Sequence, residues 1–227
     1  GATNVKICAY LPSIELEVVP ADSRVSVAVA AFDPMVDMGN SENPTRKRSE
    51  TLRLYVEREK RRTQPRFIPP QAKVSANYLS PMLAKWKARE KGYDDILLLD
   101  DDGNLTEAPT SNVFLVDQEG VLRTPSTEFV LEGVTRSGVI EVAKRDGFEV
   151  CEERISGDEV FRAREVFLTT TSQGVWPVES IDGKPVGGEG AECPGPVSRA
   201  LRERFKKVER GEDPEFIHWL TFVDEEN

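Results

Sequence analysis

The chain has 227 residues, of which 38% are hydrophobic and 31% are charged. This composition is typical of a folded protein that buries a core, and the length allows one large domain with or without a smaller companion. Acidic residues outnumber basic ones, 40 to 30, and the resulting net charge of -10 disfavours nucleic acid and anionic membrane surfaces as partners.

The three cysteines, Cys8, Cys151 and Cys193, are widely spaced. Neither a disulfide framework nor a structural zinc site has this pattern, so we expect no metal site. No apolar run approaches the roughly 18 to 20 residues that a membrane-spanning helix needs, and the opening GATNVKICAY lacks a signal-peptide pattern. We therefore expect a soluble protein of the reducing cytoplasm.

The N-terminal part of the chain predicts short strands. Residues 5–32 contain β-branched runs interrupted by Pro12 and Pro20. The stretch 39–50, GNSENPTRKRSE, is the most polar and breaker-rich part of the chain, as is typical of a linker. We therefore expect a small N-terminal region at residues 1–38, an interdomain linker at 39–50 and a large domain at 51–227.

Strands and helices are mixed in the larger region. In chain order we expect a strand (LRLYV), a helix that Ser80-Pro81 begins (MLAKWKAREKG), two hairpins (DDILLLDDDGNLTEA and SNVFLVDQEGVLRTP), a helix (LEGVTRSGVIEVAKRDG), a strand (FEVCEER), a short helix (GDEVFRAR), a strand (EVFLTTT), a strand pair (VWPVESIDGKPVG) and an amphipathic helix (VSRALRERFKKVERG). The first helix places Met82, Leu83 and Trp86 on one face, and we expect the Met and Trp positions to lie in the core.

One lysine stands out within QAKVSANY, residues 71–78, directly behind Pro69-Pro70. Lys73 precedes an uncharged run of eleven residues, VSANYLSPMLA. A lysine amine is nucleophilic only when it is neutral, and apolar surroundings favour that form. Taken alone, a solvated surface lysine is the commoner interpretation. The role of Lys73 therefore depends on the rest of the sequence.

Five segments in order place this lysine in a wider pattern. They are IPPQAKVSANYL, GYDDILLLDDDGNLTEAPTSNVFLV, LEGVTR, EVFLTTTSQGVWPV with IDGKPVG, and GPVSRAL with DPEFIHWL. Together they resemble the class IV family of pyridoxal 5'-phosphate (PLP) enzymes, which contains the branched-chain and D-amino acid aminotransferases and aminodeoxychorismate lyase. The resemblance implies an α/β (mixed α+β) fold of type IV, with a truncated small N-terminal domain and a large mixed-sheet pseudo-barrel domain.

The resemblance also implies the catalytic residues. Lys73 corresponds to the lysine that forms the Schiff base with PLP and later moves the substrate α-proton. Tyr78 corresponds to the tyrosine that hydrogen-bonds the phenolic oxygen of the coenzyme, although it could equally be a core aromatic. Glu107 corresponds to the acid that pairs with the pyridine nitrogen, with a solvated turn residue as the alternative. Ala108 and Pro109 replace the small, flexible pair of the family pattern.

The remaining implied residues bind the coenzyme phosphate, the ring and the substrate. Leu131 would pack on the ring. Val134 and Thr135, at a helix start, would bind the phosphate, although Thr135 could simply be a helix cap. Thr170 and Thr171 would give a second phosphate contact, and Ser172 would lie near the substrate carboxylate. The family usually has glycine where Thr170 stands. The threonine side chain leaves less room for a ligand to approach the backbone.

The resemblance implies PLP-dependent transamination between an amino donor and a 2-keto acid, most readily with branched-chain amino acids, by a homodimer. Three alternatives stay open. The first is a transaminase for D-amino acids or R-amines, and the second is a lyase of the aminodeoxychorismate type. The third is a non-catalytic binding or assembly protein with an incomplete coenzyme site.

The family pattern also contains an N-terminal segment with a phosphate-binding arginine, and nothing in this sequence matches it. Either the chain is the C-terminal part of a longer polypeptide, or it is a shortened relative. We expect the former, because residues 5–32 resemble only the last strands of the small domain and two or three strands hardly fold alone.

Overall fold

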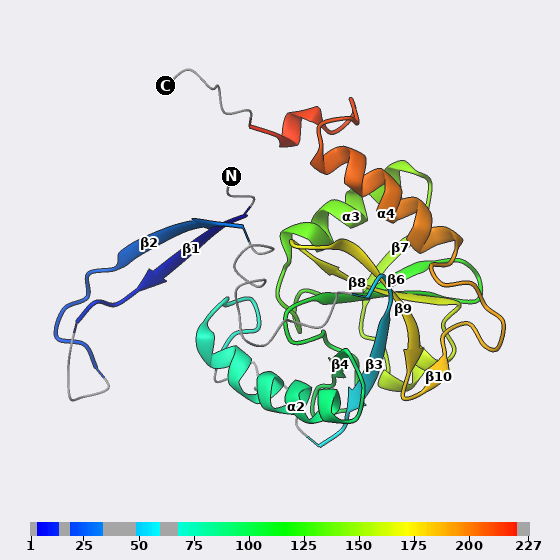
Figure 1. Ribbon diagram of the computed structural model, residues 1–227, viewed down its shortest axis with the longest axis horizontal. Coiled ribbons are helices and arrows are strands. Elements are labelled where there is room, and N and C mark those ends of the chain that lie inside the picture. Colours follow the sequence, from blue (N-terminus) through cyan, green and yellow to red (C-terminus); the bar gives the residue numbers. More distant parts are fainter. Residues whose placement is uncertain (1–3, 14–18, 34–48, 60–67, 222–227) are drawn as a thin grey trace. The chain divides into compact units, whose positions relative to one another are not determined.

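The computed structural model describes residues 4–13, 19–33, 49–59 and 68–221. The chain divides into two compact units, Gly1–Ser49 and Glu50–Asn227 (Figure 1). Most of the predicted linker, residues 39–48, lies outside the described residues, so the linker and the domain limits stay predictions.

The first unit is a two-stranded antiparallel hairpin. Strands β1 (Asn4–Tyr10) and β2 (Ser26–Phe32) pair so that Ile7 lies opposite Val29. Because side chains alternate along a strand, Val5, Ile7, Val27 and Val29 share one face, and all four are exposed. A further β-branched run of this region, LEVV at residues 16–19, lies almost entirely outside the described residues.

The second unit is built on one mixed sheet. Its strands are β3 (Leu52–Glu57), β4 (Asp95–Leu98), β5 (Asn112–Val116), β6 (Leu122–Pro125), β7 (Val150–Glu153), β8 (Glu165–Thr170), β9 (Gly174–Ile181) and β10 (Lys184–Pro185). Their order is β4-β3-β9-β8-β5-β6-β7, with β10 paired to β9. β3 runs parallel to β4 and β9, β6 runs parallel to β7, and the other pairs are antiparallel. The predicted mixed α+β fold is confirmed.

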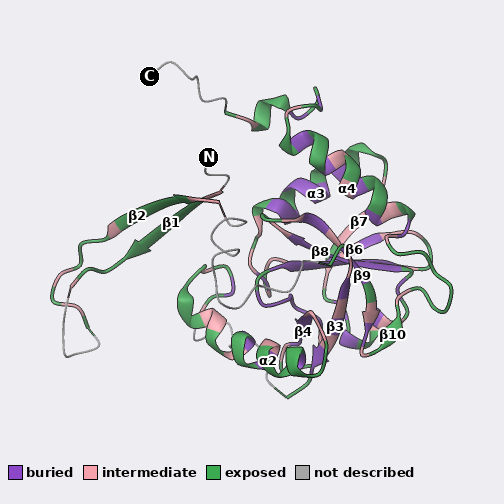
Figure 2. Ribbon diagram, viewed as in Figure 1, coloured by how far each residue is buried: buried purple, intermediate pink, exposed green. Residues whose placement is uncertain are grey.

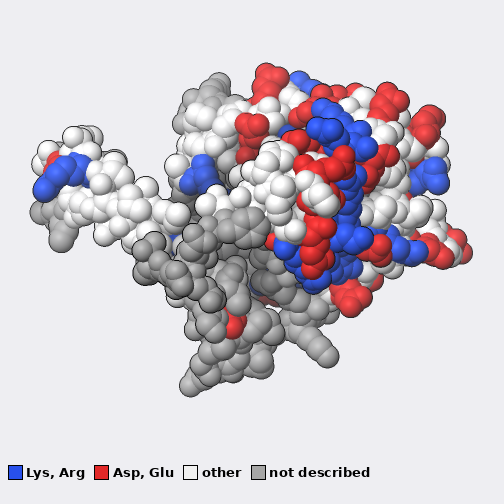
Figure 3. Space-filling model, turned by 90° about the horizontal axis from the view of Figure 1, so that it is seen from above, with Lys and Arg blue, Asp and Glu red and all other residues white. Residues whose placement is uncertain are grey.

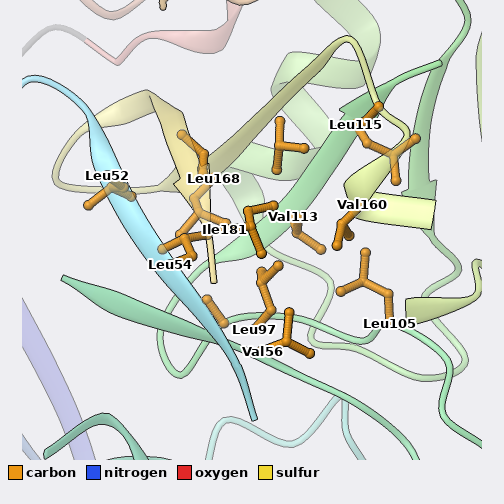
Figure 4. Close-up of a cluster of buried hydrophobic side chains, with 14 of the residues drawn as sticks. Leu52, Leu54, Val56, Leu97, Leu105, Val113, Leu115, Val160, Leu168 and Ile181 are labelled. Carbon is orange, nitrogen blue, oxygen red and sulfur yellow. The ribbon is translucent and has the colours of Figure 1, made fainter. Parts of the chain in front are cut away.

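One face of this sheet curls around a core of its own. The inward side chains of β3, β4, β5, β8 and β9 meet in a single cluster, part of which is labelled in Figure 4 (Leu52, Leu54, Val56, Leu97, Leu105, Val113, Leu115, Val160, Leu168, Ile181). Each fully buried side chain of this size contributes about 1.5–3 kcal/mol. Strands that are distant in sequence therefore face one another, as in the predicted pseudo-barrel.

Helices cover the other surfaces. α3 (Val134–Arg145) and α4 (Pro196–Glu209) pack against Phe114 and Phe167 on the opposite face of the sheet. α2 (Leu79–Glu90) packs on β4 and follows the short 3-10 helix η1 (Ser75–Tyr78). Two further 3-10 helices are η2 (Gly157–Phe161) and η3 (Ile217–Trp219). Figure 2 shows buried residues concentrated where α3, α4 and the central strands meet.

The predicted buried face of the first helix is wrong. Met82, Leu83 and Trp86 are exposed, Trp86 to 63%. Ala84 and Ala88 contact Ile96 and Leu98 instead, in a small separate cluster. Only small residues allow the helix backbone to lie this close to β4, so the large side chains point outward. Ser80 also does not cap the helix, which begins one residue earlier, at Leu79.

The first predicted hairpin is present after β4. Leu99 pairs with Leu105 in antiparallel fashion, and the N–H groups of Leu98 and Asp100 donate to the carbonyls of Glu107 and Asn104. Other local expectations differ from the structure. Trp176 is only partly buried, packing at the margin of the barrel core, and Trp219 lies at the exposed C-terminal end. His218 is exposed, and its ring makes a T-shaped contact with that of Trp219.

Surface charges are mixed. On the face drawn in Figure 3, acidic and basic side chains lie close together. Arg204 of α4 contacts Asp146, Asp213 and Glu215, and thereby ties the helix to the turn after α3 and to the C-terminal segment. Within the described residues, no helix has the length and apolar character needed to cross a membrane.

Candidate active site

A buried carboxylate lies at the centre of the candidate site. Glu107 is only 7% exposed, and its Oε2 accepts hydrogen bonds from the backbone N–H of Leu131 at 3.0 Å and from Asn112 Nδ2 at 3.2 Å. Asn112 Nδ2 also donates to the Leu131 carbonyl at 2.8 Å. Donors of this kind stabilise the ionised carboxylate. The Glu107 carboxylate is therefore held between β5 and the segment before α3.

The same asparagine explains the glycine that starts α3. A Cβ on Gly133 would lie 2.2 Å from Asn112 Oδ1, so only glycine fits at this position. Gly133 is the N-cap of α3, and no side chain of the described residues caps this helix end. The first N–H groups of a helix lack intrahelical acceptors and favour anions. Thr135 therefore lies inside the first turn, and its interpretation as an N-cap is wrong.

A buried arginine fixes the first turn of α3 to the sheet. Arg136 is 1% exposed, and its Nη2 donates to the carbonyl of Pro125 at 2.9 Å and to Glu152 Oε2 at 2.8 Å. Val134, in contrast, is exposed to 87%, and Thr135 is buried. Arg136 thus holds the first turn of α3 against β6 and β7, while Val134 of the same turn faces solvent.

The threonines of TTTSQG lie at the neighbouring strand end. Thr169 pairs with Asn112 across β8 and β5, so the two side chains lie on the same face of the sheet. Thr169 Oγ1 is buried and has no hydrogen-bond partner among the described residues. Thr170 is half-buried at the end of β8, and Thr171 and Ser172 are exposed in the turn before β9. Strand pairing therefore brings this turn next to the start of α3.

Lys73 and Tyr78 lie on one short stretch before α2. Lys73 is exposed, and Tyr78, the last residue of η1, is half-buried. Gln71 Nε2 donates to the carbonyl of Thr127 at 2.5 Å, and this hydrogen bond fixes the stretch against the loop that ends at Leu131. The lysine segment and the Glu107 junction thus share one loop, residues 126–131.

That loop is braced on its other side by Arg154. Its guanidinium lies 4.8 Å from the centre of the Phe129 ring and pairs with Asp100 and Asp102. Burial opposes the ionisation of Asp100, but hydrogen bonds from Asn104 and Arg154 hold the pKa of that carboxyl below its ordinary value. The brace is therefore charged across the neutral pH range.

The structure thus brings together Glu107, Leu131, Gly133 and the Thr170 turn, with the Lys73 stretch joined to them through Gln71. The positioning contacts made by Gln71 and Arg136 had no signal in the sequence, because their acceptors are backbone carbonyls far along the chain. Among the described residues, no group of three His, Cys, Asp or Glu side chains could hold a metal ion.

Two solved structures similar to this chain are aminotransferases. The Thermobaculum terrenum branched-chain amino acid aminotransferase in its PLP form matches with a TM-score of 0.82 and 30% identity, over 96% of this chain and 67% of that chain. The Escherichia coli branched-chain amino acid aminotransferase matches with a TM-score of 0.82 and 31% identity, over 97% and 69%. The chain therefore has the fold of these aminotransferases over most of its length.

Sequence relatives lead to the same class. The branched-chain-amino-acid aminotransferase of Escherichia coli (strain K12) is 39% identical over 165 residues, which are 72% of this chain and 52% of that protein. That of Pseudomonas aeruginosa is 33% identical over 153 residues, 67% and 48% of the two chains. The chain spans about half the length of the curated relatives it matches. The model of the amino-transferase class IV family matches residues 9–181, and the chain belongs to this family.

Proposed function

We propose that this chain carries the coenzyme site of a PLP-dependent aminotransferase that acts on branched-chain amino acids and a 2-keto acid. The observation that carries the proposal is the buried Glu107 carboxylate, which two N–H donors stabilise beside a helix start that no described side chain caps. An acidic side chain that two N–H donors orient in this way suits the protonated ring nitrogen of the coenzyme as a partner.

The residues present fit the coenzyme. The N-terminal turn of α3, with Val134 and Thr135, would bind the phosphate, and Thr170 and Thr171 would add contacts from the adjacent turn. Leu131, whose backbone is fixed by Glu107 and Asn112, would contact the ring face. Glu107 would hold the proton on the ring nitrogen. When bound, PLP supplies an electron sink for the negative charge that forms at the substrate α-carbon.

Lys73 and Tyr78 then have separate tasks. Lys73 would hold the coenzyme through a covalent bond that an amino donor displaces, and the freed Nζ amine would then move a proton between the substrate α-carbon and the coenzyme. The Tyr78 hydroxyl donates a hydrogen bond to the phenolic oxygen of the coenzyme. Ser172 and the backbone amides of the same turn, where Thr171 and Ser172 are exposed, would orient the substrate carboxylate.

The substrate class follows from the relatives, which are named for branched-chain amino acids. We extend the proposal to a cytoplasmic homodimer. An exposed apolar stripe on α2, formed by Leu79, Met82, Leu83 and Trp86, supports association, because such stripes are seldom left in water.

The test is a half-reaction followed by its visible spectrum. The chain is incubated with PLP, and L-leucine is added without a keto acid; the proposal expects conversion of the coenzyme band to the amine form, reversed by 2-oxoglutarate. D-leucine and R-amines are tested in parallel. Aminodeoxychorismate is tested in a separate assay, in which release of pyruvate without a keto acid acceptor would identify a lyase instead. Lys73→Ala should abolish conversion. If the parent chain binds PLP but converts no donor, the proposed activity is wrong.

A further inference from the structure

We propose that Asn77 is a positioning residue for Lys73, and that its side-chain amide aims the lysine by closing the turn on which it lies. This inference rests on the proposed role of Lys73 and goes beyond it, because the Asn77 amide would act through the backbone at Ala72 and not through the coenzyme or the substrate.

The backbone around Lys73 consists of successive tight turns. The N–H of Ala72 donates to the Pro69 carbonyl at 3.0 Å, and the N–H of Val74 donates to the Ala72 carbonyl at 2.9 Å. The second hydrogen bond joins residues i and i+2, which defines a γ-turn with Lys73 as its central residue. Among the described residues only Asp182 combines a positive φ with a side chain, so the turn at Lys73 is of the unstrained, inverse kind.

Asn77 adds a second donor to the same carbonyl. Its Nδ2 lies 2.9 Å from the Ala72 oxygen, and its own backbone N–H donates to the Val74 carbonyl at 3.1 Å. The Ala72 oxygen therefore accepts two hydrogen bonds, one from the backbone of Val74 and one from the Asn77 side chain. The loop from Ala72 to Asn77 is closed by a side chain as well as by the backbone.

This closure matters because the lysine side chain has no other support in the described structure that would aim it. Lys73 is exposed, and a lysine stem has several rotatable bonds, so its direction depends on the backbone at its base. Tyr78 directly follows Asn77 and serves as the N-cap of α2. The Asn77 amide therefore fixes the backbone at Lys73 and, with it, the position of Tyr78 relative to that lysine.

Gln71 and Asn77 have complementary tasks. Gln71 anchors the stretch to Thr127 in another part of the fold, whereas Asn77 fixes its internal shape. Losing the Asn77 amide leaves the anchor in place but frees the turn. We therefore expect a local loss of lysine reactivity without a loss of the fold.

The experiment follows the rate at which PLP labels each lysine. The parent chain, Asn77→Asp and Asn77→Ala are mixed with PLP, reduced with borohydride at timed intervals and digested, and the pyridoxyl adduct is measured on each lysine peptide. Asn77→Asp keeps the size of the side chain but removes the donor. In both variants we expect labelling of Lys73 to slow about tenfold, equivalent to about 1.4 kcal/mol. Labelling of Lys85 and Lys87 should be unchanged.

Gln118→Ala is the matched control. Gln118 Nε2 also donates to a backbone carbonyl, that of Arg162 at 2.6 Å, but Gln118 lies in the turn between β5 and β6, and this contact does not include Lys73. The substitution should cost similar stability and leave Lys73 labelling unchanged. If the Asn77 variants label Lys73 at the parent rate, the positioning role is wrong even though the proposed function stands. If the parent shows no preference for Lys73, the proposed function itself fails.

Hydrogen exchange of the parent chain tests the same turn without any variant. The amides of Val74 and Asn77 should exchange more slowly than an unstructured peptide of the same sequence. Exchange at the unstructured rate would overturn the inference, and circular dichroism of both Asn77 variants identifies any that do not fold.

Discussion

The starts of α3 and α4 differ in whether a side chain of the protein caps the helix. Both helices follow a glycine that leaves no room for a Cβ, Gly133 against Asn112 and Gly195 against Glu165. At α4 the Glu165 carboxylate accepts the N–H groups of Val197 and Ser198 at 2.9 and 2.8 Å. At α3 no side chain of the described residues caps the helix.

One fold thus uses the same element, a helix start that follows a glycine, in two different ways. A helix start carries partial positive charge and needs an acceptor. α4 obtains it from the protein's own carboxylate, so its start is complete without a ligand. α3 is held rigidly by Arg136 and Gly133 but keeps its N–H groups for an anion from outside, which we propose is the coenzyme phosphate.

The largest effect should come from breaking the internal cap. Glu165→Ala leaves the N–H groups of Val197 and Ser198 and the Ser198 hydroxyl without their acceptor, and we expect the free energy of unfolding to fall by about 3 kcal/mol. Urea unfolding followed by circular dichroism measures this. Glu203→Ala, an exposed acid on the same helix, should change stability by less than about 0.5 kcal/mol. A loss below about 1 kcal/mol for Glu165→Ala would contradict the cap.

The next effect tests the packing of the α3 start. Gly133→Ala forces Asn112 away from Leu131 and Glu107, and we expect a loss of about 2 kcal/mol in stability together with about tenfold weaker binding of PLP. Gly195→Ala is the counterpart at α4. It should also destabilise the chain but leave PLP affinity unchanged. If both variants weakened PLP binding equally, the start of α3 would not be a specific coenzyme site.

A smaller effect should appear when the hydroxyl at the α3 start is removed. Thr135→Val keeps the shape of the side chain, and we expect about fivefold weaker binding of PLP, or about 1 kcal/mol. Pyridoxal, which lacks the phosphate, should bind equally well to parent and variant in fluorescence titrations. Ser137→Ala, on the exposed side of the same helix, serves as control. If Thr135→Val weakened the binding of pyridoxal as much as that of PLP, Thr135 would not bind the phosphate.

The smallest effect concerns pH and the second half of α4. The Arg204 guanidinium hydrogen-bonded to Asp213 holds the pKa of that carboxyl below its ordinary value. A depressed folded-state pKa gives stability above the unfolded value that is lost as pH falls through the folded one. The difference in unfolding free energy between parent and Asp213→Asn should thus be constant above about pH 5 and shrink below about pH 4. A difference that persists unchanged to lower pH would exclude this ion pair as its source.

Sequence periodicity predicted the sheet and two of the three long helices well. Val139, Ile140 and Ala143 of α3 are buried as their helical spacing indicates. The face of α2 could not be predicted in the same way, because close packing of Ala84 and Ala88 on β4 reverses the usual preference for large residues inside.

The candidate site could be predicted from the sequence mainly through the family resemblance. The order of Lys73, Glu107 and Thr135 indicated coenzyme chemistry, and the structure joins Glu107 to Leu131 across 24 positions of sequence. No local pattern could have indicated that Asn112 bridges these two residues, or that Gly133 is required by the Asn112 side chain. Such contacts depend on the tertiary fold.

The central claim is that Lys73 is the residue to which PLP becomes attached. Borohydride reduction of the chain after incubation with excess PLP, followed by peptide mass mapping, tests it most directly. We expect the pyridoxyl group on the peptide that contains Lys73, and loss of the coenzyme's visible absorbance in Lys73→Ala. An unmodified Lys73, or a Lys73→Ala variant that keeps the absorbance, would contradict the account.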